Sequence, residues 1–114
     1  MLNRKHRFHG HNSLNYVYRR GKIVRSPYCA MHFAKGKYDN YRVAVVVNKK
    51  VAKSAPHRNR IRRRLYEAIR QLADDLLTNQ DIVVTVFDEQ FLNLEAKEID
   101  NSIKRQLEQI AKLS

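Results

Sequence analysis

The sequence has little of what small extracellular proteins use to hold themselves together. Its 114 residues include one cysteine (Cys29), two prolines, three glycines and no tryptophan. A single cysteine excludes an internal disulfide framework, fits a reducing compartment, and is expected here to be a small core residue. No apolar run approaches the roughly 20 residues of a membrane span, and residues 1–12 lack the apolar stretch of a secretory signal. We therefore expect a cytoplasmic protein.

Acidic residues are nearly absent from the first half of the chain. Residues 1–66 contain 18 of the 23 Lys and Arg residues and one acid, Asp39, whereas residues 67–114 contain 10 of the 11 acids. The formal net charge of the whole chain is +12. This split predicts one strongly positive surface that suits a polyanion. A membrane suits it less well, because no stretch combines a basic helix face with exposed large apolar residues.

Length and periodicity predict a single α+β domain over residues 1–114. Residues 1–12 are expected to be a flexible basic arm that orders on contact with phosphate, and their histidines fit no standard zinc spacing. The remaining elements follow in the order α-β-β-β-α-β-α with a four-stranded sheet, over residues 13–21, 22–25, 28–34, 41–48, 55–77, 82–87 and 93–113. Asn93 is the expected cap of the last helix, which should cover the face of the sheet opposite the first helix.

The strand segments carry specific expectations about pairing. Residues 41–48 are nearly unbroken in apolarity, which predicts a central strand. The short turn before them predicts an antiparallel hairpin with residues 28–34. In that earlier strand, alternation assigns Cys29, Met31 and Phe33 to the core and leaves Tyr28 and His32 on the open face. Residues 41–48 and 82–87 flank a helix, and such a βαβ unit predicts parallel pairing.

The densest basic stretch runs from Lys49 to Arg70 and contains a single acid, Glu67. Ser54 and Pro56 suit the start of a helix here, with an apolar stripe through Ile61 and Leu65 facing the core. Crowded arginines repel one another on a helix, and their planar forks grip phosphate oxygens in pairs. The candidate RNA ligands are Lys49, Lys50, Lys53, Arg58, Asn59, Arg60, Arg62, Arg63 and Arg70.

The same stretch resembles the signature of the protein subunit of bacterial ribonuclease P. A lysine pair, Lys49-Lys50, follows a strand. A basic helix then begins with the run Arg58-Asn59-Arg60 and contains the pair Glu67-Ala68 further along. Two positions depart from the family pattern: Arg64 stands where an apolar residue is usual, and Tyr66 where a basic one is common. The resemblance implies that the basic helix docks on a catalytic RNA, and that the βαβ crossover is left-handed.

The resemblance also implies a reaction and a second binding site. The ribonucleoprotein would hydrolyse precursor tRNA at the 5′ end of the mature tRNA, with Mg²⁺ held by RNA phosphates rather than by protein ligands. A cleft between the first helix and the sheet would hold the single-stranded leader. Carried over to this chain, the cleft residues are Leu14, Tyr18, Arg19, Tyr28 and His32, of which Tyr18 keeps the usual aromatic character. The implied partners are the catalytic RNA and precursor tRNA, with no obligate protein partner.

From the residues alone, the chain is an RNA-binding protein without catalytic residues of its own. The basic half offers one acid, and no histidine spacing brings an acid and a base together. Acids at the ends of elements, such as Asp74 and Asp88, are expected to be solvated caps and turns rather than metal ligands. Two alternatives stay open: a ribosomal or RNA-assembly protein with no enzymatic association, and an autonomous metal-dependent nuclease.

Overall fold

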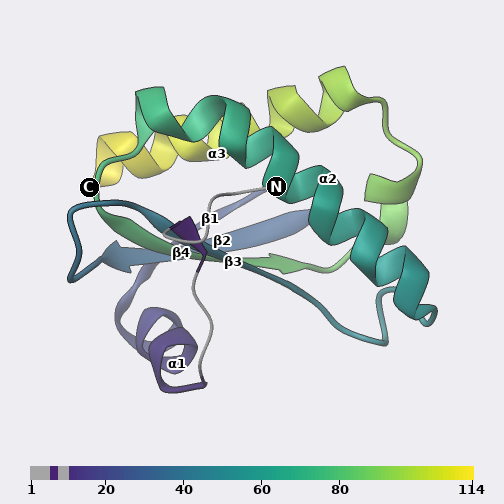
Figure 1. Ribbon diagram of the computed structural model, residues 1–114, viewed down its shortest axis with the longest axis horizontal. Helices are drawn as coiled ribbons and strands as arrows, with labels where there is room; N and C mark the ends of the chain where they lie inside the picture. Colours follow the sequence, from purple (N-terminus) through teal and green to yellow (C-terminus); the bar gives the residue numbers. More distant parts are fainter. Residues whose placement is uncertain (1–5, 8–10) are drawn as a thin grey trace.

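The computed structural model describes residues 6–7 and 11–114 of the chain. The predicted class and element order are confirmed, with a short 3₁₀ helix added before the last helix (Figure 1). The elements are α1 (His11–Arg20), β1 (Lys22–Arg25), β2 (Cys29–Lys35), β3 (Arg42–Val47), α2 (Ala55–Leu76), β4 (Gln80–Val86), η2 (Glu89–Leu92) and α3 (Ala96–Leu113). Among the described residues, no helix is long and apolar enough to cross a membrane.

The four strands form one mixed sheet in the order β1-β2-β4-β3. β4 runs antiparallel to β2 and parallel to β3, so the predicted parallel pairing across α2 is confirmed. The predicted hairpin between residues 28–34 and 41–48 is wrong, because β4 lies between these two strands. Six of the seven β4 residues are buried, and a strand with both faces covered is most stable between two partners.

β3 is therefore an edge strand, and its predicted central position is also wrong. Its apolar run has a different cause, since both of its faces are covered. Val43 and Val45 join the main core, and Ala44 joins a smaller cluster on the opposite face. The described part of the N-terminal arm lies beside this edge, where Arg7 forms a parallel bridge with Val43.

His6 fastens the same arm to the start of β3. Its Nδ1 donates a hydrogen bond of 2.8 Å to the Tyr41 carbonyl, and its ring stacks on the Tyr41 ring with 3.9 Å between centroids. Burial raises the pKa of Tyr41 to about 12, with a further contribution from Asp74. The predicted flexible arm covers residues 1–12: residues 1–5 and 8–10 lie outside the described residues, and residues 11 and 12 belong to α1 instead.

Helices cover both faces of the sheet. α2 and α3 lie together over one face, and α1 lies alone on the other (Figure 1). Cys29, Met31 and Phe33 point into the main core as predicted, with exposed fractions of 0%, 0% and 3%. They meet Ile61 and Leu65 of the predicted apolar stripe, and each such side chain contributes about 1.5–3 kcal/mol by its burial. The predicted placement of the last helix on the face opposite α1 is confirmed.

The helix ends agree with the sequence in part. Ser54 caps α2, as predicted, by accepting a hydrogen bond from the His57 N–H. α1 begins at His11, two residues before the predicted cap Ser13. It ends at Arg20, and at the next residue, Gly21, a Cβ would come within 2.5 Å of backbone oxygens of Val17 and Phe33. Glycine is required here by the close approach of β2.

The predicted start of the last helix at Asn93 is wrong. Asn93 instead ends η2, and its N–H donates to the Gln90 carbonyl at 2.8 Å. The cap position of α3 is Glu95, two residues after Asn93, and the helix begins at Ala96. Asp88 caps η2 through its side chain, so this acid is a cap, as expected. A four-residue turn of 3₁₀ helix is too short to show periodicity in the sequence.

Candidate RNA interface

The loop before α2 and α2 as far as Arg70 carry the predicted RNA-binding residues on one continuous stretch of chain. We call this set the basic surface: Lys49, Lys50, Lys53, Arg58, Asn59, Arg60, Arg62, Arg63 and Arg70. All are exposed except Arg58 and Arg62, which are half-buried. The apolar stripe of α2 faces the opposite way, into the core. The helix thus separates a packing side from a charged side, and the N-terminal end of its dipole adds positive potential.

The lysine-bearing loop is held in a defined shape. Asn48 Oδ1 accepts hydrogen bonds from the Lys50 and Val51 N–H groups at 2.9 and 3.2 Å. Arg58 reaches back from α2, and its Nη1 donates to the carbonyls of Ala52 and Lys53 at 3.0 and 2.9 Å. Arg58 therefore positions the loop, in addition to carrying charge. A loop that is ordered before binding loses less entropy when RNA binds.

Two other members of the basic surface have partners within α2. Arg62 donates to the Asn59 side chain at 2.7 Å. Arg70 forms an ion pair with Glu67, with 2.5 Å between Nη2 and Oε1. The hydrogen bonds from Arg70 lower the pKa of Glu67 to about 2, so Glu67 stays ionised and offsets the Arg70 charge. Arg60 and Arg63, which are exposed, are stronger phosphate candidates than Arg70.

The two departures from the family pattern have structural explanations. Arg64 turns away from the basic surface and donates to the carbonyls of Phe91 and Leu94, on either side of the η2 end. Tyr66 lies over the edge strand, where its hydroxyl oxygen accepts a hydrogen bond from the Val45 N–H at 3.1 Å. The structure uses both to hold α2 against its neighbours.

A second group of side chains lies on the α1 face of the sheet. The Tyr18 hydroxyl and the Thr85 hydroxyl are 2.9 Å apart, and the Tyr18 ring meets the His32 ring edge-on at 4.8 Å. We call these three residues the Tyr18 group. Leu14 of α1 is half-buried and packs against the small apolar cluster between α1 and the sheet. Arg19, also on α1, is exposed. The structure thus brings together Tyr18 and His32, which are far apart in sequence.

His32 has an unusual environment within this group. Among the residues described by the structure, its Nδ1 is buried without a hydrogen-bond partner. Burial lowers the pKa of His32, and the charge of Arg25 lowers it further. The imidazole is therefore neutral at pH 7 and offers a ring face rather than a positive charge.

Tyr28 was predicted for the same open face, and that prediction is wrong. Its ring packs edge-on against Phe91 with 5.5 Å between centroids, on the side of the main core. The alternation that predicted its position begins only at Cys29, where β2 starts. Before it, Ser26 Oγ accepts hydrogen bonds from the Tyr28 and Cys29 N–H groups, and this turn redirects the Tyr28 side chain.

Phe87 is a candidate that sequence reasoning missed. It was assigned to a buried strand, but its side chain is 49% exposed. Its N–H donates to the Tyr28 carbonyl at 3.1 Å, which continues the pairing of β4 with β2 by one residue. Alternation along β4 then places Phe87 on the same face as Thr85. An exposed aromatic ring therefore follows directly after the Tyr18 group.

The acids do not form a metal site in the described part of the chain. No group of three or more His, Cys, Asp or Glu side chains lies close enough there to hold a metal ion. Asp81 is committed to Arg42, and Asp88 to the cap of η2.

The fold and its two surfaces define a small α+β RNA-binding protein, with cations on one helix and aromatic rings on the opposite face of the sheet. The chain belongs to the ribonuclease P protein family, whose sequence model, described as Ribonuclease P, matches residues 2–111. It is therefore a ribonuclease P subunit that binds the ribonuclease P RNA and acts in tRNA processing. This assignment rules out the ribosomal or RNA-assembly alternative.

Individual relatives agree with the family. The chain is 37% identical over 83 residues to the ribonuclease P protein component of Coprothermobacter proteolyticus, covering 73% of this chain and 67% of that protein. It is 35% identical to that of Clostridioides difficile, covering 77% and 76%. The Staphylococcus aureus RNase P protein structure has a TM-score of 0.78 at 24% identity, covering 94% of this chain and 95% of that one. The Thermotoga maritima protein has a TM-score of 0.77 at 23% identity, covering 84% and 89%, so both show a shared fold.

Proposed function

We propose that this protein is the accessory subunit of a ribonucleoprotein endoribonuclease that removes the 5′ leader from precursor tRNA, with the RNA subunit as the catalyst. The observation that carries the proposal is the preorganised basic surface. Arg58 fixes the loop of Lys49, Lys50 and Lys53 beside the start of α2. Clustered cations held in this way suit a folded RNA backbone, which is read by its shape and phosphates.

We assign the leader to the Tyr18 group. Base stacking on an aromatic side chain contributes about 1–3 kcal/mol per base and tolerates any sequence. The exposed Tyr18 ring and the neutral His32 ring suit an unpaired base, while Leu14 adds an apolar contact and Arg19 a phosphate contact. Tyr28 leaves this set because it packs against Phe91. Phe87 takes its place, since its exposed ring continues the same face of β4.

We assign Mg²⁺ to the phosphates of the RNA. When bound there, the ion supplies the charge stabilisation and activated water that phosphodiester hydrolysis needs. The protein contributes positive charge, which lowers the repulsion between substrate and catalytic RNA. Less Mg²⁺ is then needed to bring the two together.

The test is a reconstitution with the matched catalytic RNA and precursor tRNA at low Mg²⁺, where the RNA alone is slow. Adding the protein should restore cleavage at the 5′ end of the mature tRNA, and raising Mg²⁺ should reduce the protein's effect. A protein that leaves the rate unchanged at every Mg²⁺ concentration contradicts the proposal. Cleavage by protein without RNA would support the autonomous nuclease instead.

A further inference from the structure

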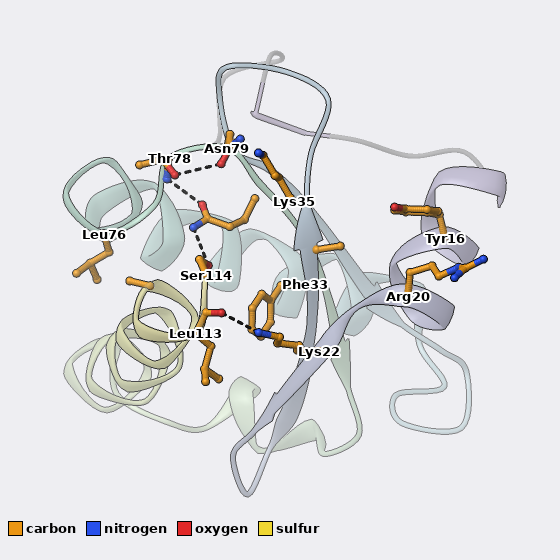
Figure 2. Close-up of a pocket in the computed structure, with 13 residues that line it drawn as sticks. Tyr16, Arg20, Lys22, Phe33, Lys35, Leu76, Thr78, Asn79, Leu113 and Ser114 are labelled. Carbon is orange, nitrogen blue, oxygen red and sulfur yellow. Dashed lines mark hydrogen bonds between the residues drawn. The ribbon is translucent and has the colours of Figure 1, made fainter.

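Two neighbouring hollows lie on the flank of α1 that carries Tyr16. The first, of about 650 Å³, lies between α1, strands β1 and β2, and the ends of α2 and α3, and Arg20 is among its lining residues; Figure 2 shows Tyr16 extending toward it from α1, with Lys22 and Lys35 on the strands. The second, of about 420 Å³, lies between α1 and the loop of residues 36–41. Tyr16 and Lys35 line both. We call the two hollows together the Tyr16–Tyr38 groove.

The Tyr38 ring is a preformed stacking platform in this groove. The guanidinium of Arg42 lies 4.6 Å from the centroid of the ring and supports it. Asp81 holds Arg42 in turn with two hydrogen bonds, of 2.9 and 2.7 Å. Both charged side chains are largely buried, whereas Tyr38 is 55% exposed. A layered arrangement of carboxylate, guanidinium and ring thus fixes an aromatic surface that remains open to a ligand.

The loop that carries Tyr38 is anchored at its base. The Gly36 N–H donates to the Asn79 carbonyl at 2.8 Å. A Cβ at Gly36 would lie 2.7 Å from both the Asn79 carbonyl and the Asp81 carboxylate, so the approach requires glycine. The Arg42–Asp81 pair then closes the other end of the loop on β4. The platform is therefore positioned by the sheet rather than by the loop alone.

The charges in the groove favour an anion. Arg20, Lys35 and Lys37 are exposed around it, and Lys22 donates to the Leu113 carbonyl. Asp81, an acid that lines the groove, is paired with Arg42. Aromatic rings flanked by lysines match the alternation of base and phosphate in a single strand. A protein partner fits less well, because lysine is depleted at the centres of protein–protein interfaces.

We propose that the Tyr16–Tyr38 groove binds an unpaired stretch of RNA, with a base stacked on the Tyr38 ring and phosphates held by Lys35 and Lys37. The inference rests on the proposed function, since it requires that the protein works while bound to RNA. It adds a site that is separate from the Tyr18 group, because residues 16 and 18 are about 200° apart on a helix. The unpaired stretch can belong to the substrate leader or to the catalytic RNA.

The experiment compares Tyr38→Ala with Tyr38→Phe in the full-length protein. One arm measures the affinity of the protein for the catalytic RNA alone; the other measures the affinity of the holoenzyme for precursor tRNA with a long or a short leader. Tyr38→Ala should weaken binding roughly tenfold in one arm, and Tyr38→Phe should bind like the parent protein. A loss confined to the long leader identifies the leader as the ligand, and a loss in the first arm identifies the catalytic RNA.

Charge-matched variants complete the test. Lys37→Ala should weaken binding in the same arm, whereas Lys104→Ala, an exposed lysine of α3 on the other side of the sheet, should not. Unchanged affinity of Tyr38→Ala in both arms, or an equal loss in Tyr38→Phe, overturns the inference. Arg60→Ala is measured alongside. If Arg60→Ala weakens binding and Tyr38→Ala does not, the groove inference alone fails; if neither does, the proposed function fails as well.

Discussion

At the scale of single residues, position on α2 does not by itself reveal what an arginine does. Arg60 and Arg64 are one helical turn apart and carry the same charge. Arg60 is exposed on the basic surface, whereas Arg64 donates to two carbonyls around the C-terminal end of η2. Arg58 combines a structural and a binding role, because its guanidinium holds the loop while its positive charge remains near the lysines. The structure therefore divides one basic run into binding residues and packing residues.

This division predicts opposite outcomes for two alanine substitutions. Arg60→Ala should weaken binding to the catalytic RNA several-fold and leave the free energy of unfolding nearly unchanged. Arg64→Ala should lower the free energy of unfolding by about 1–3 kcal/mol, because two carbonyls lose a charged donor, and should leave RNA affinity nearly intact once the protein is folded. Urea denaturation and RNA titration of both variants measure the two effects. An unfolded Arg60→Ala protein would show that Arg60 is structural.

At the scale of elements, the polar contacts between α2 and its neighbours explain how the basic helix is oriented. Tyr66 satisfies the Val45 N–H on the edge strand β3, and Arg64 fixes the connection to α3. On the same face of the sheet, the buried Gln106 of α3 donates to the carbonyls of Val24 and Cys29. Each contact ties one helix to a defined position on the sheet, which apolar packing alone specifies less sharply.

The Tyr66 contact gives an element-scale prediction. Tyr66→Phe keeps the ring and removes the acceptor of the Val45 N–H, so the free energy of unfolding should fall by about 1 kcal/mol. Hydrogen exchange of the Val45 amide should become faster than that of its neighbours in β3. Tyr16→Phe, at an exposed tyrosine of α1, is the matched control and should unfold like the parent protein. Equal stability of Tyr66→Phe and the parent would mean that water replaces the hydroxyl.

At the scale of the whole molecule, the basic, aromatic and acidic side chains lie on different parts of the fold. The basic surface occupies one end of α2, the Tyr18 group lies on the α1 face of the sheet, and α3 with its acids covers the opposite face (Figure 1). Binding to RNA should then depend on the number of phosphates that the basic surface contacts.

A salt series tests this expectation. Between about 50 and 200 mM salt, the affinity for the catalytic RNA should fall on the order of a hundredfold or more, with log Kd linear in log salt concentration. Removing one phosphate contact, as in Arg60→Ala, should reduce the slope by about one. The control Lys104→Ala should keep the parent slope. An affinity that does not change with salt would contradict a phosphate-binding surface.

The sequence by itself determined what depends on local pattern and composition. The charge split, the two stripes of α2, its Ser54 cap and the core side of β2 all follow from spacing along the chain, whereas the cleft that contains Tyr18 and His32 was implied by the family resemblance. Such features need only the 3.6-residue period of a helix or the two-residue period of a strand. The family signature in residues 49–68 is local in the same sense.

Only the tertiary structure decided which strands are neighbours and where side chains at element ends point. β4 separates β2 from β3, Tyr28 turns to Phe91, and Tyr66 reaches the edge of β3; each depends on residues distant in the sequence. The unbroken apolar run of β3 predicted a central strand. An edge strand has the same run when helices cover both faces of the sheet, because side chains on both faces are then buried. Strand order is set by which pairings bury the most surface over the whole chain, and no local period records that choice.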